Sequence, residues 1–116
     1  MAKKTSRGKR VRRNAPAENT DRLSHDATVR LFEWAYDRAL MAHAALRRYR
    51  EMALLDDKGA CLHALLSAST SIGNAEAALA VLQAHGDLSV YNDDEHAHLL
   101  GITASAVSDR ASLVGM

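Results

Sequence analysis

Apolar residues recur every three or four positions along two long segments of the chain, at about residues 24–55 and 60–85. The stripe of the first segment consists of Phe32, Ala35, Ala39, Ala42, Leu46, Tyr49 and Ala53. The stripe of the second consists of Cys61, Leu65, Ala68, Ile72, Ala75, Leu79 and Leu82. This spacing places each stripe on one face of an α-helix. Both stripes are about 31 Å long at 1.5 Å per residue, which predicts an antiparallel hairpin of two packed helices.

Residues that favour helix ends bracket both segments. Ser24 is placed to cap the first helix, and an aspartate in the polar turn at residues 56–59 is placed to cap the second. Gly86 follows the second segment as a common helix stop. Residues 67–74 are poor helix formers, which predicts either a kink near Gly73 or a place where two backbones approach closely.

Two short helices are expected after the hairpin. Asn92 is placed to cap a helix over residues 93–100, Gly101 would end it, and Thr103 would cap a last helix that reaches about Leu113. The predicted fold class is therefore all-α, with one helical domain over residues 21–116. A hydrophobic content of 47% with only 4% aromatic residues agrees with closely packed helices.

The charges are unevenly distributed along the chain. The first thirteen residues contain seven cations and no acid: Lys3, Lys4, Arg7, Lys9, Arg10, Arg12 and Arg13. From Asn14 onward, eight basic residues stand against fourteen acidic ones, a formal charge of about −6. Residues 1–20 have too few apolar groups to offset ordering entropy, which predicts a disordered basic arm. Such an arm would bind nucleic acid without sequence preference. A solvated tail, a targeting signal and a contact with an acidic protein are the alternatives.

A second apolar set lies on another side of the first predicted helix: Ala27, Leu31, Trp34, Met41, Ala45 and Met52. A two-helix hairpin does not cover both sets, so the remainder must meet the C-terminal helices or another chain. The candidate partner interface consists of Leu31, Trp34, Met41 and Met52. Because isolated hairpins are seldom stable alone, this pattern favours a homo-oligomer or a larger assembly.

A short pattern in residues 93–113 comprises Ala97, Leu100, Gly101, Ile102, Thr103, Ser105, Ala106, Val107 and Ser108. It resembles the helix-turn-helix motif of DNA-binding proteins, over about a sixth of the chain. The resemblance implies a reading helix whose groove-facing candidates are Ser105, Ser108, Asp109 and Ser112, with Arg110 as its cation. The sequence departs from the motif at His96 and Arg110, where apolar residues are usual. The acids at 93–95 also have the wrong sign for a phosphate backbone.

Signatures of catalysis, metal binding and membrane insertion are missing from the sequence. Cys61 is the single cysteine, and the six histidines include no pair four residues apart. No glycine-rich phosphate loop or paired-carboxylate motif is present. We therefore predict a protein that is not an enzyme and has no metal or cofactor. We also expect no membrane span, because no apolar run approaches about 20 residues.

Three functional hypotheses follow. The leading one is a non-enzymatic assembly protein that oligomerises or packs on a partner and grips nucleic acid through its arm, the layout of a virion or ribonucleoprotein component. The second is a helix-turn-helix regulator that reads DNA through residues 93–113 and dimerises through the hairpin. The third is a protein–protein adaptor that does not bind nucleic acid. The expected location is the cytoplasm, or a particle packaged from it.

Overall fold

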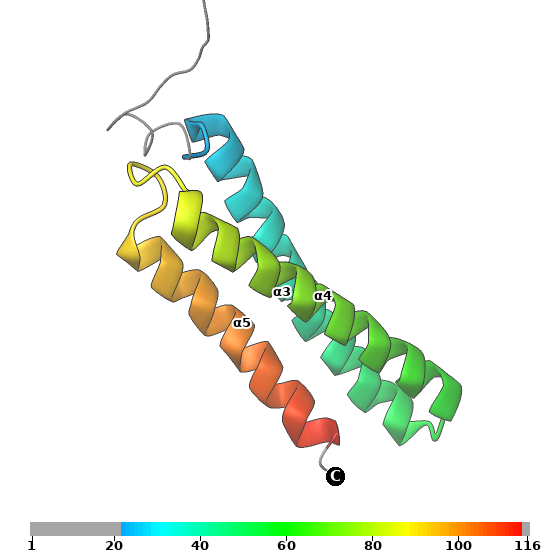
Figure 1. Ribbon diagram of the computed structural model, residues 1–116. Coiled ribbons are helices and arrows are strands. Elements are labelled where there is room, and N and C mark those ends of the chain that lie inside the picture. The colour runs from blue at the N-terminus through cyan, green and yellow to red at the C-terminus, as the bar shows by residue number, and fades with distance from the viewer. Residues whose placement is uncertain (1–21, 115–116) are drawn as a thin grey trace, which may run out of the picture.

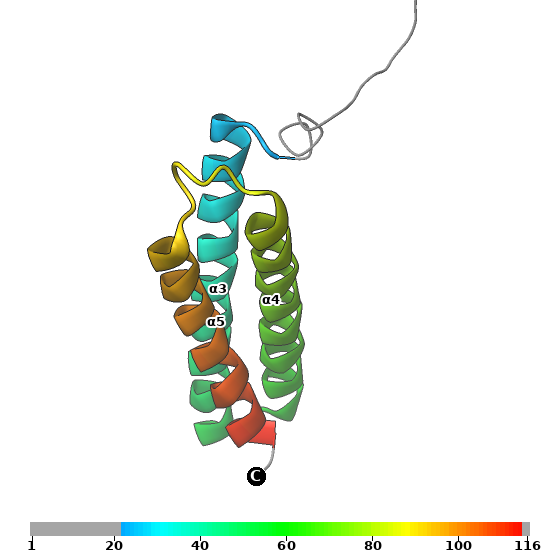
Figure 2. The ribbon, with the colours of Figure 1, turned by 60° about the vertical axis from the view of Figure 1, so that its left-hand side comes forward.

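The computed structural model describes residues 22–114 as three helices without strands: α3 (His25–Leu54), α4 (Lys58–His85) and α5 (Asp93–Val114). α3 and α4 run antiparallel beside each other, and α5 lies along one side of this α3–α4 pair (Figures 1 and 2). The predicted all-α class is confirmed. The predicted basic arm lies outside the described residues.

The contact between α3 and α4 is built largely from alanine. The buried alanines are Ala35, Ala39, Ala42 and Ala45 on α3, and Ala64, Ala68, Ala75 and Ala78 on α4. Small side chains let the two backbones approach closely. Leu46, Ile72 and Leu82 are the large buried side chains of the pair, each at most 1% exposed. Complete burial of such a side chain contributes about 1.5–3 kcal/mol, so these three residues supply much of the hydrophobic stabilisation.

The predicted caps are confirmed at both helices of the pair. The Oγ of Ser24 accepts a 3.1 Å hydrogen bond from the Ala27 amide, and Oδ1 of Asp57 accepts one of 3.0 Å from the Ala60 amide. The turn between the helices needs a left-handed residue, and Asp56 occupies it with φ 57°. Aspartate is one of the few residues other than glycine that adopt this conformation at modest cost.

Gly86 ends α4 for a steric reason. Its φ is −66°, which any residue adopts. A Cβ at this position would lie 2.6 Å from the Leu82 carbonyl oxygen, closer than side chains tolerate. Glycine is therefore required here because the backbone of the preceding turn is so close.

α4 is continuous through residues 67–74, so the helix does not break near Gly73. Gly73 is exposed, whereas Ala68, Ser71 and Ala75 are buried. The other sequence interpretation is the right one, because the small residues of this run lie where α4 packs closely.

The expectation of two short C-terminal helices is wrong. α5 runs unbroken through Gly101, and Thr103 is an interior residue whose Oγ1 donates a 2.9 Å hydrogen bond to the Leu99 carbonyl. Leu99, Thr103 and Ala106 are all buried, and their spacing of four and three places them on one face of a single helix. Packing of this face outweighs the helix penalty of one glycine, about 1 kcal/mol. Asn92 does cap the helix, since its Oδ1 accepts a 3.0 Å hydrogen bond from the Glu95 amide.

Within the described residues, α4 alone is long and apolar enough to cross a membrane by length and composition. Its most apolar stretch of 18 residues has a mean hydropathy of 1.2, and 39% of that stretch is buried in the bundle. A core helix that packs against two neighbours, as α4 does, satisfies the same criteria. The composition of α4 therefore does not by itself establish membrane association.

Candidate interaction surfaces

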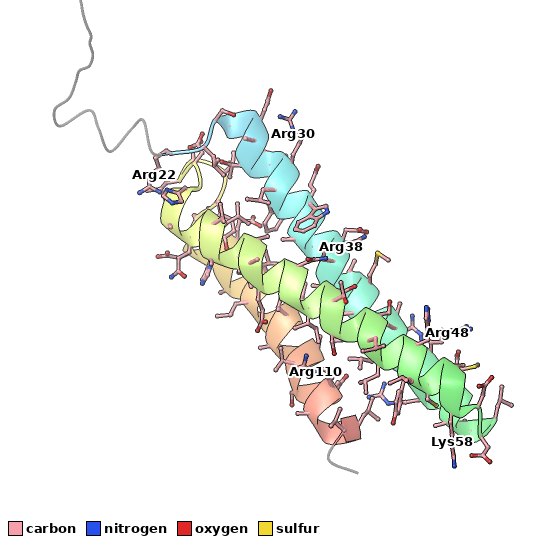
Figure 3. The ribbon with its side chains drawn as sticks, turned by 45° about the vertical axis from the view of Figure 1, so that its right-hand side comes forward. Arg22, Arg30, Arg38, Arg48, Lys58 and Arg110 are labelled. Carbon is pink, nitrogen blue, oxygen red and sulfur yellow. The ribbon has the colours of Figure 1, made fainter. Side chains whose placement is uncertain are left out.

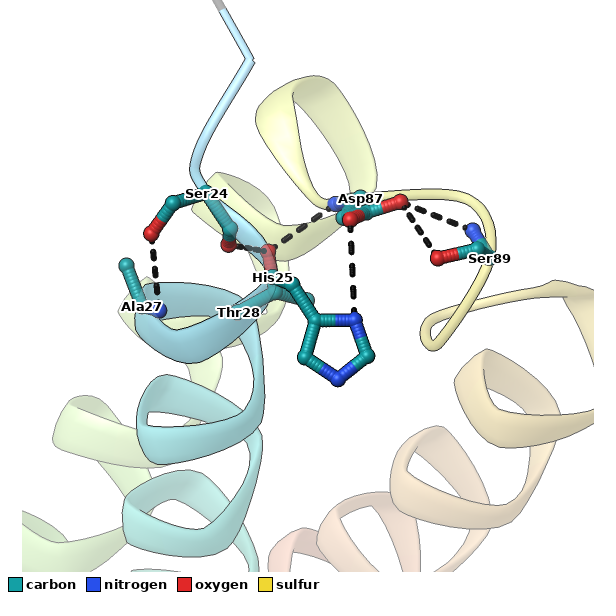
Figure 4. A network of polar contacts seen from close by, with 6 residues as sticks. All are labelled: Ser24, His25, Ala27, Thr28, Asp87 and Ser89. Atoms are coloured by element: carbon teal, nitrogen blue, oxygen red, sulfur yellow. Dashed lines mark hydrogen bonds and ion pairs between the residues drawn. The ribbon is translucent and has the colours of Figure 1, made fainter.

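The start of α3, the end of α4 and the start of α5 lie at one end of the bundle (Figure 1). A small polar network there joins the start of α3 to the connection between α4 and α5 (Figure 4). Thr28 is fully buried, and its Oγ1 donates a 2.8 Å hydrogen bond to the Ser24 carbonyl. The same oxygen accepts a 3.0 Å bond from the Asp87 amide. One side chain thus fixes the first turn of α3 to the segment that leads from α4 into α5.

The residues that precede α3 close the end of α4. The Leu23 amide donates a 2.7 Å hydrogen bond to the His85 carbonyl, and Nη1 of Arg22 donates one of 2.9 Å to the Gly86 carbonyl. These carbonyls have no partner inside the helix, so the bonds complete α4. The residues before α3 are therefore fixed to the end of α4.

Asp87 is the charged centre of this junction. Its carboxylate accepts hydrogen bonds from the Ser89 amide at 2.9 Å and the Ser89 hydroxyl at 2.8 Å. These bonds lower the pKa of Asp87 below its usual value, with smaller help from the positive charges of His25 and Arg22. His25 Nδ1 lies 3.9 Å from the carboxylate. The junction thus favours a charged Asp87.

The face of the α3–α4 pair that α5 covers is rich in aromatic rings. The Phe32 ring lies 6.0 Å from Tyr91, and Tyr36 meets His98 edge-on at 5.6 Å between centroids. His43 Nε2 donates a 3.0 Å hydrogen bond to the Ile102 carbonyl of α5. Burial raises the pKa of Tyr91 to about 12, with a smaller contribution from the negative charge of Glu95. These contacts hold α5 in place.

The opposite face of the pair has no helix over it within residues 22–114, and we call it the open face. Its prominent side chains are Trp34 and Met41 of α3, each 45% exposed, and Leu66 of α4, 58% exposed. Between the helices it is hollowed over a floor of small residues. This hollow is lined by Met41, Ala44, Ala45, Arg48, His63, Ala64 and Ser67.

Charged side chains follow α3 beside the hollow, and Figure 3 shows Arg30, Arg38 and Arg48 in succession along this helix. Arg38 is engaged within the bundle: its Nη2 donates a 2.8 Å hydrogen bond to Asp37 Oδ2, and its guanidinium lies 6.0 Å from the Trp34 ring centroid. Arg48 is exposed and makes no ion pair with any described residue. It is therefore available to a partner.

The structure divides the predicted partner interface. Trp34 and Met41 lie on the open face, as that interpretation requires. Leu31 is half-buried against the core, and Met52 is half-buried near the end of α3. Sequence reasoning missed Arg48, although its position seven residues after Met41 and fourteen after Trp34 places it on the same side of the helix.

The candidate base-reading residues do not form a reading helix. The turn that a helix-turn-helix motif requires is absent from the described chain, because α5 is continuous. Ser105 and Ser108 are exposed, but half-buried Arg110 leans on α4, where its Nη1 lies 3.5 Å from the Ser69 hydroxyl. Asp109 faces α3, 3.6 Å from Arg50. The two-helix arrangement that the resemblance implies for residues 93–113 is therefore not present.

Residues 22–114 bring together no group of three His, Cys, Asp or Glu side chains that could hold a metal ion. Cys61 is half-buried, and its sulfur faces the Tyr49 carbonyl at 3.7 Å. The candidate basic-arm residues Lys3 to Arg13 lie outside the described residues. No protein-family model, curated protein or solved structure matches this chain.

Proposed function

We propose that this protein is a non-enzymatic assembly component that packs through its helical bundle and contacts nucleic acid through residues 1–13. The observation that carries the proposal is the charge distribution: seven cations without an acid precede a body with an excess of acids. A cluster of this density neutralises several phosphates and releases their counterions, so the contact is strong at low salt and independent of base sequence. The protein would act in the cytoplasm or inside a particle packaged there.

The charges at one end of the bundle support a separation of the nucleic-acid contact from the assembly contact. Arg22 and Leu23 are hydrogen-bonded to the end of α4, so the described chain meets the bundle at that end. That end also carries acids: Asp26, Asp87, Asp93, Asp94 and Glu95. Their charge repels phosphates. The proposal therefore assigns the nucleic-acid contact to the segment and the assembly contact to the bundle.

The test is a salt-titrated binding curve with random-sequence DNA and with RNA. The logarithm of the affinity should fall linearly with the logarithm of salt concentration, with a slope of up to about −6 for duplex DNA if all seven cations reach phosphates. Replacement of the seven cations by glutamine should abolish binding while circular dichroism remains unchanged. A matched control removes three cations of the bundle, Arg47, Lys58 and Arg110, and should retain most of the affinity.

Two outcomes contradict the proposal. If the glutamine variant binds as well as the unaltered protein, residues 1–13 are not the contact. If the unaltered protein shows no retention of DNA or RNA at low salt, the protein is instead an adaptor, and its cations meet an acidic protein surface.

A further inference from the structure

We propose that the open face is a self-association surface, on which a second copy of this chain packs with its α3 antiparallel to the first and Met41 near the two-fold axis. The inference deepens the assembly part of the proposed function, because it names the partner and the geometry. Three features of the described residues support it: the positions of large and small side chains, the order of the charges, and the size of the face.

The large side chains and the hollow are placed so that each copy fits the other. Trp34 and Arg48 are each seven residues from Met41, on opposite sides of it. In an antiparallel pair centred on Met41, the Trp34 ring of one copy therefore lies opposite Arg48 of the other. Arg48 borders the hollow, whose floor of Ala44, Ala45, Ala64 and Ser67 leaves room for a ring.

A two-fold axis produces this contact twice. A protruding side chain and a hollow on the same face are what an isologous interface requires, since each copy supplies both. Trp34 then buries its exposed half and stacks against the Arg48 guanidinium, a combination found often at the energetic centre of interfaces.

The charges on α3 favour the antiparallel direction. Around Met41 the pairing brings Glu33 of one copy near Arg48 of the other, and Arg30 near Glu51. All four side chains are exposed and none has an ion-pair partner among residues 22–114. A parallel pairing in register would place Arg48 against Arg48 and Glu33 against Glu33, which like-charge repulsion opposes.

The open face is large enough for a stable dimer. α4 has 28 residues, and α3 has 30, so each is about 42–45 Å long at 1.5 Å per residue. Two adjacent helices with axes about 8–10 Å apart present a face about 18–20 Å wide. Its area is therefore about 800 Å², which is the amount that each partner buries in a protein interface of standard size.

The first test combines sedimentation equilibrium with a charge exchange. The unaltered protein should have twice the mass of one chain at micromolar concentration. Arg48→Glu places like charges together at two symmetric contacts and should raise the dimer dissociation constant at least about tenfold. The double variant Glu33→Arg/Arg48→Glu restores opposite charges but not the stacking on Trp34, so its constant should lie between those of Arg48→Glu and the unaltered protein. Arg47→Glu, an identical exchange at the neighbouring exposed position, should change it less than about twofold.

Trp34 is the single tryptophan of the chain, so its fluorescence reports on the same contact. Dilution of the unaltered protein should shift the emission to longer wavelength as the ring becomes exposed to water. Arg48→Glu should show the exposed spectrum at every concentration. A spectrum that does not change across the dimer–monomer transition would place Trp34 outside the interface.

Cysteine cross-linking tests the position of the axis. In a Cys61→Ser background, Met41→Cys should form a disulfide-linked dimer rapidly under mild oxidation, because two copies of this residue meet at the axis. Leu40→Cys, also about half exposed but on the adjacent side of α3, should remain monomeric on denaturing gels. Equal cross-linking at both positions would contradict the proposed axis.

The failure of this inference is distinguishable from that of the proposed function. A mass of one chain up to about 100 μM overturns the dimer, and a dimer insensitive to Arg48→Glu overturns its placement on the open face. Binding of DNA by the monomeric Arg48→Glu variant is measured separately. If that variant still binds in a salt-dependent manner, the nucleic-acid contact stands even where the dimer does not.

Discussion

The two faces of the α3–α4 pair differ in the side chains at the seam and in what covers them. On the covered face, large side chains such as Leu46 and Ile72 cluster with Ala106 of α5, whereas the open face is hollowed over a floor of alanine and serine. Larger side chains stand at the edges of both faces. On one face these larger side chains, Phe32 and Tyr36, meet rings of α5 and of the connection before it. On the other face Trp34 and Met41 remain about half exposed. α5 covers its face of the pair with inward residues of modest size, Leu99, Thr103 and Ala106.

The burial of each face therefore depends on whether α5 covers it. The polar junction at the end of α4 selects that face, because Thr28 and Asp87 fix the path of the connection. The open face has no such cover among the described residues, so Trp34 and Met41 remain exposed to solvent. Three substitutions test how α5 and the junction hold the covered face.

The largest effect is expected from Leu99→Ala on the covered face. Leu99 is fully buried where α5 meets the pair, so truncation should lower the free energy of unfolding by about 2–5 kcal/mol. The neighbouring Leu100 is 48% exposed, and Leu100→Ala should change stability by less than about 0.5 kcal/mol. Urea unfolding followed by circular dichroism measures both. Similar losses in the two variants would mean that α5 does not pack as described.

A smaller effect of opposite sign is expected from Gly101→Ala. Gly101 lies inside a continuous helix, and an added Cβ would meet nothing within 4 Å. Alanine should therefore stabilise the protein by about 0.5–1 kcal/mol. The same exchange would destabilise a helix-turn-helix in which glycine forms the turn. A lower melting temperature for this variant would restore the two-helix interpretation of residues 93–113.

The smallest effect is expected on the pH dependence of the melting temperature, through Asp87 at the junction. The folded state lowers the pKa of Asp87, so this group contributes stability above its unfolded pKa, near 3.8, and the contribution is lost as pH falls through the lower folded value. The drop in melting temperature between about pH 6 and pH 3 should be smaller in Asp87→Asn than in the unaltered protein. An equal drop in the two proteins would mean that the hydrogen bonds from Ser89 do not favour the charged form of Asp87.

Much of the fold is readable from local patterns. Ser24, Asp57 and Asn92 cap their helices through bonds within three residues, so sequence spacing is enough to find them. The helix end expected at Gly101 does not occur, because the buried stripe of Leu99, Thr103 and Ala106 continues across this local helix breaker. Packing of that stripe on α3 and α4 decides the outcome, and a propensity scale does not include it.

The candidate surface was only partly predictable for a similar reason. Helical periodicity grouped Leu31 with Trp34, but α4 covers one side of α3 more than the other, which leaves Trp34 exposed and Leu31 packed. Arg48 has a regular position in the pattern, yet nothing local distinguishes it from its neighbours Arg47 and Arg50. Arg48 borders the hollow only because α4 lies beside it and supplies the other wall.

The sequence by itself determined the helices, their caps and the separation of a basic segment from an acidic body, because these depend on neighbours a few residues apart. The tertiary structure alone decided that α5 is one helix and which face of the pair it covers. It also decided which apolar side chains of α3 remain exposed. Those outcomes depend on contacts between residues distant along the chain, such as the Thr28 hydroxyl with the Asp87 amide, and no local pattern encodes such contacts.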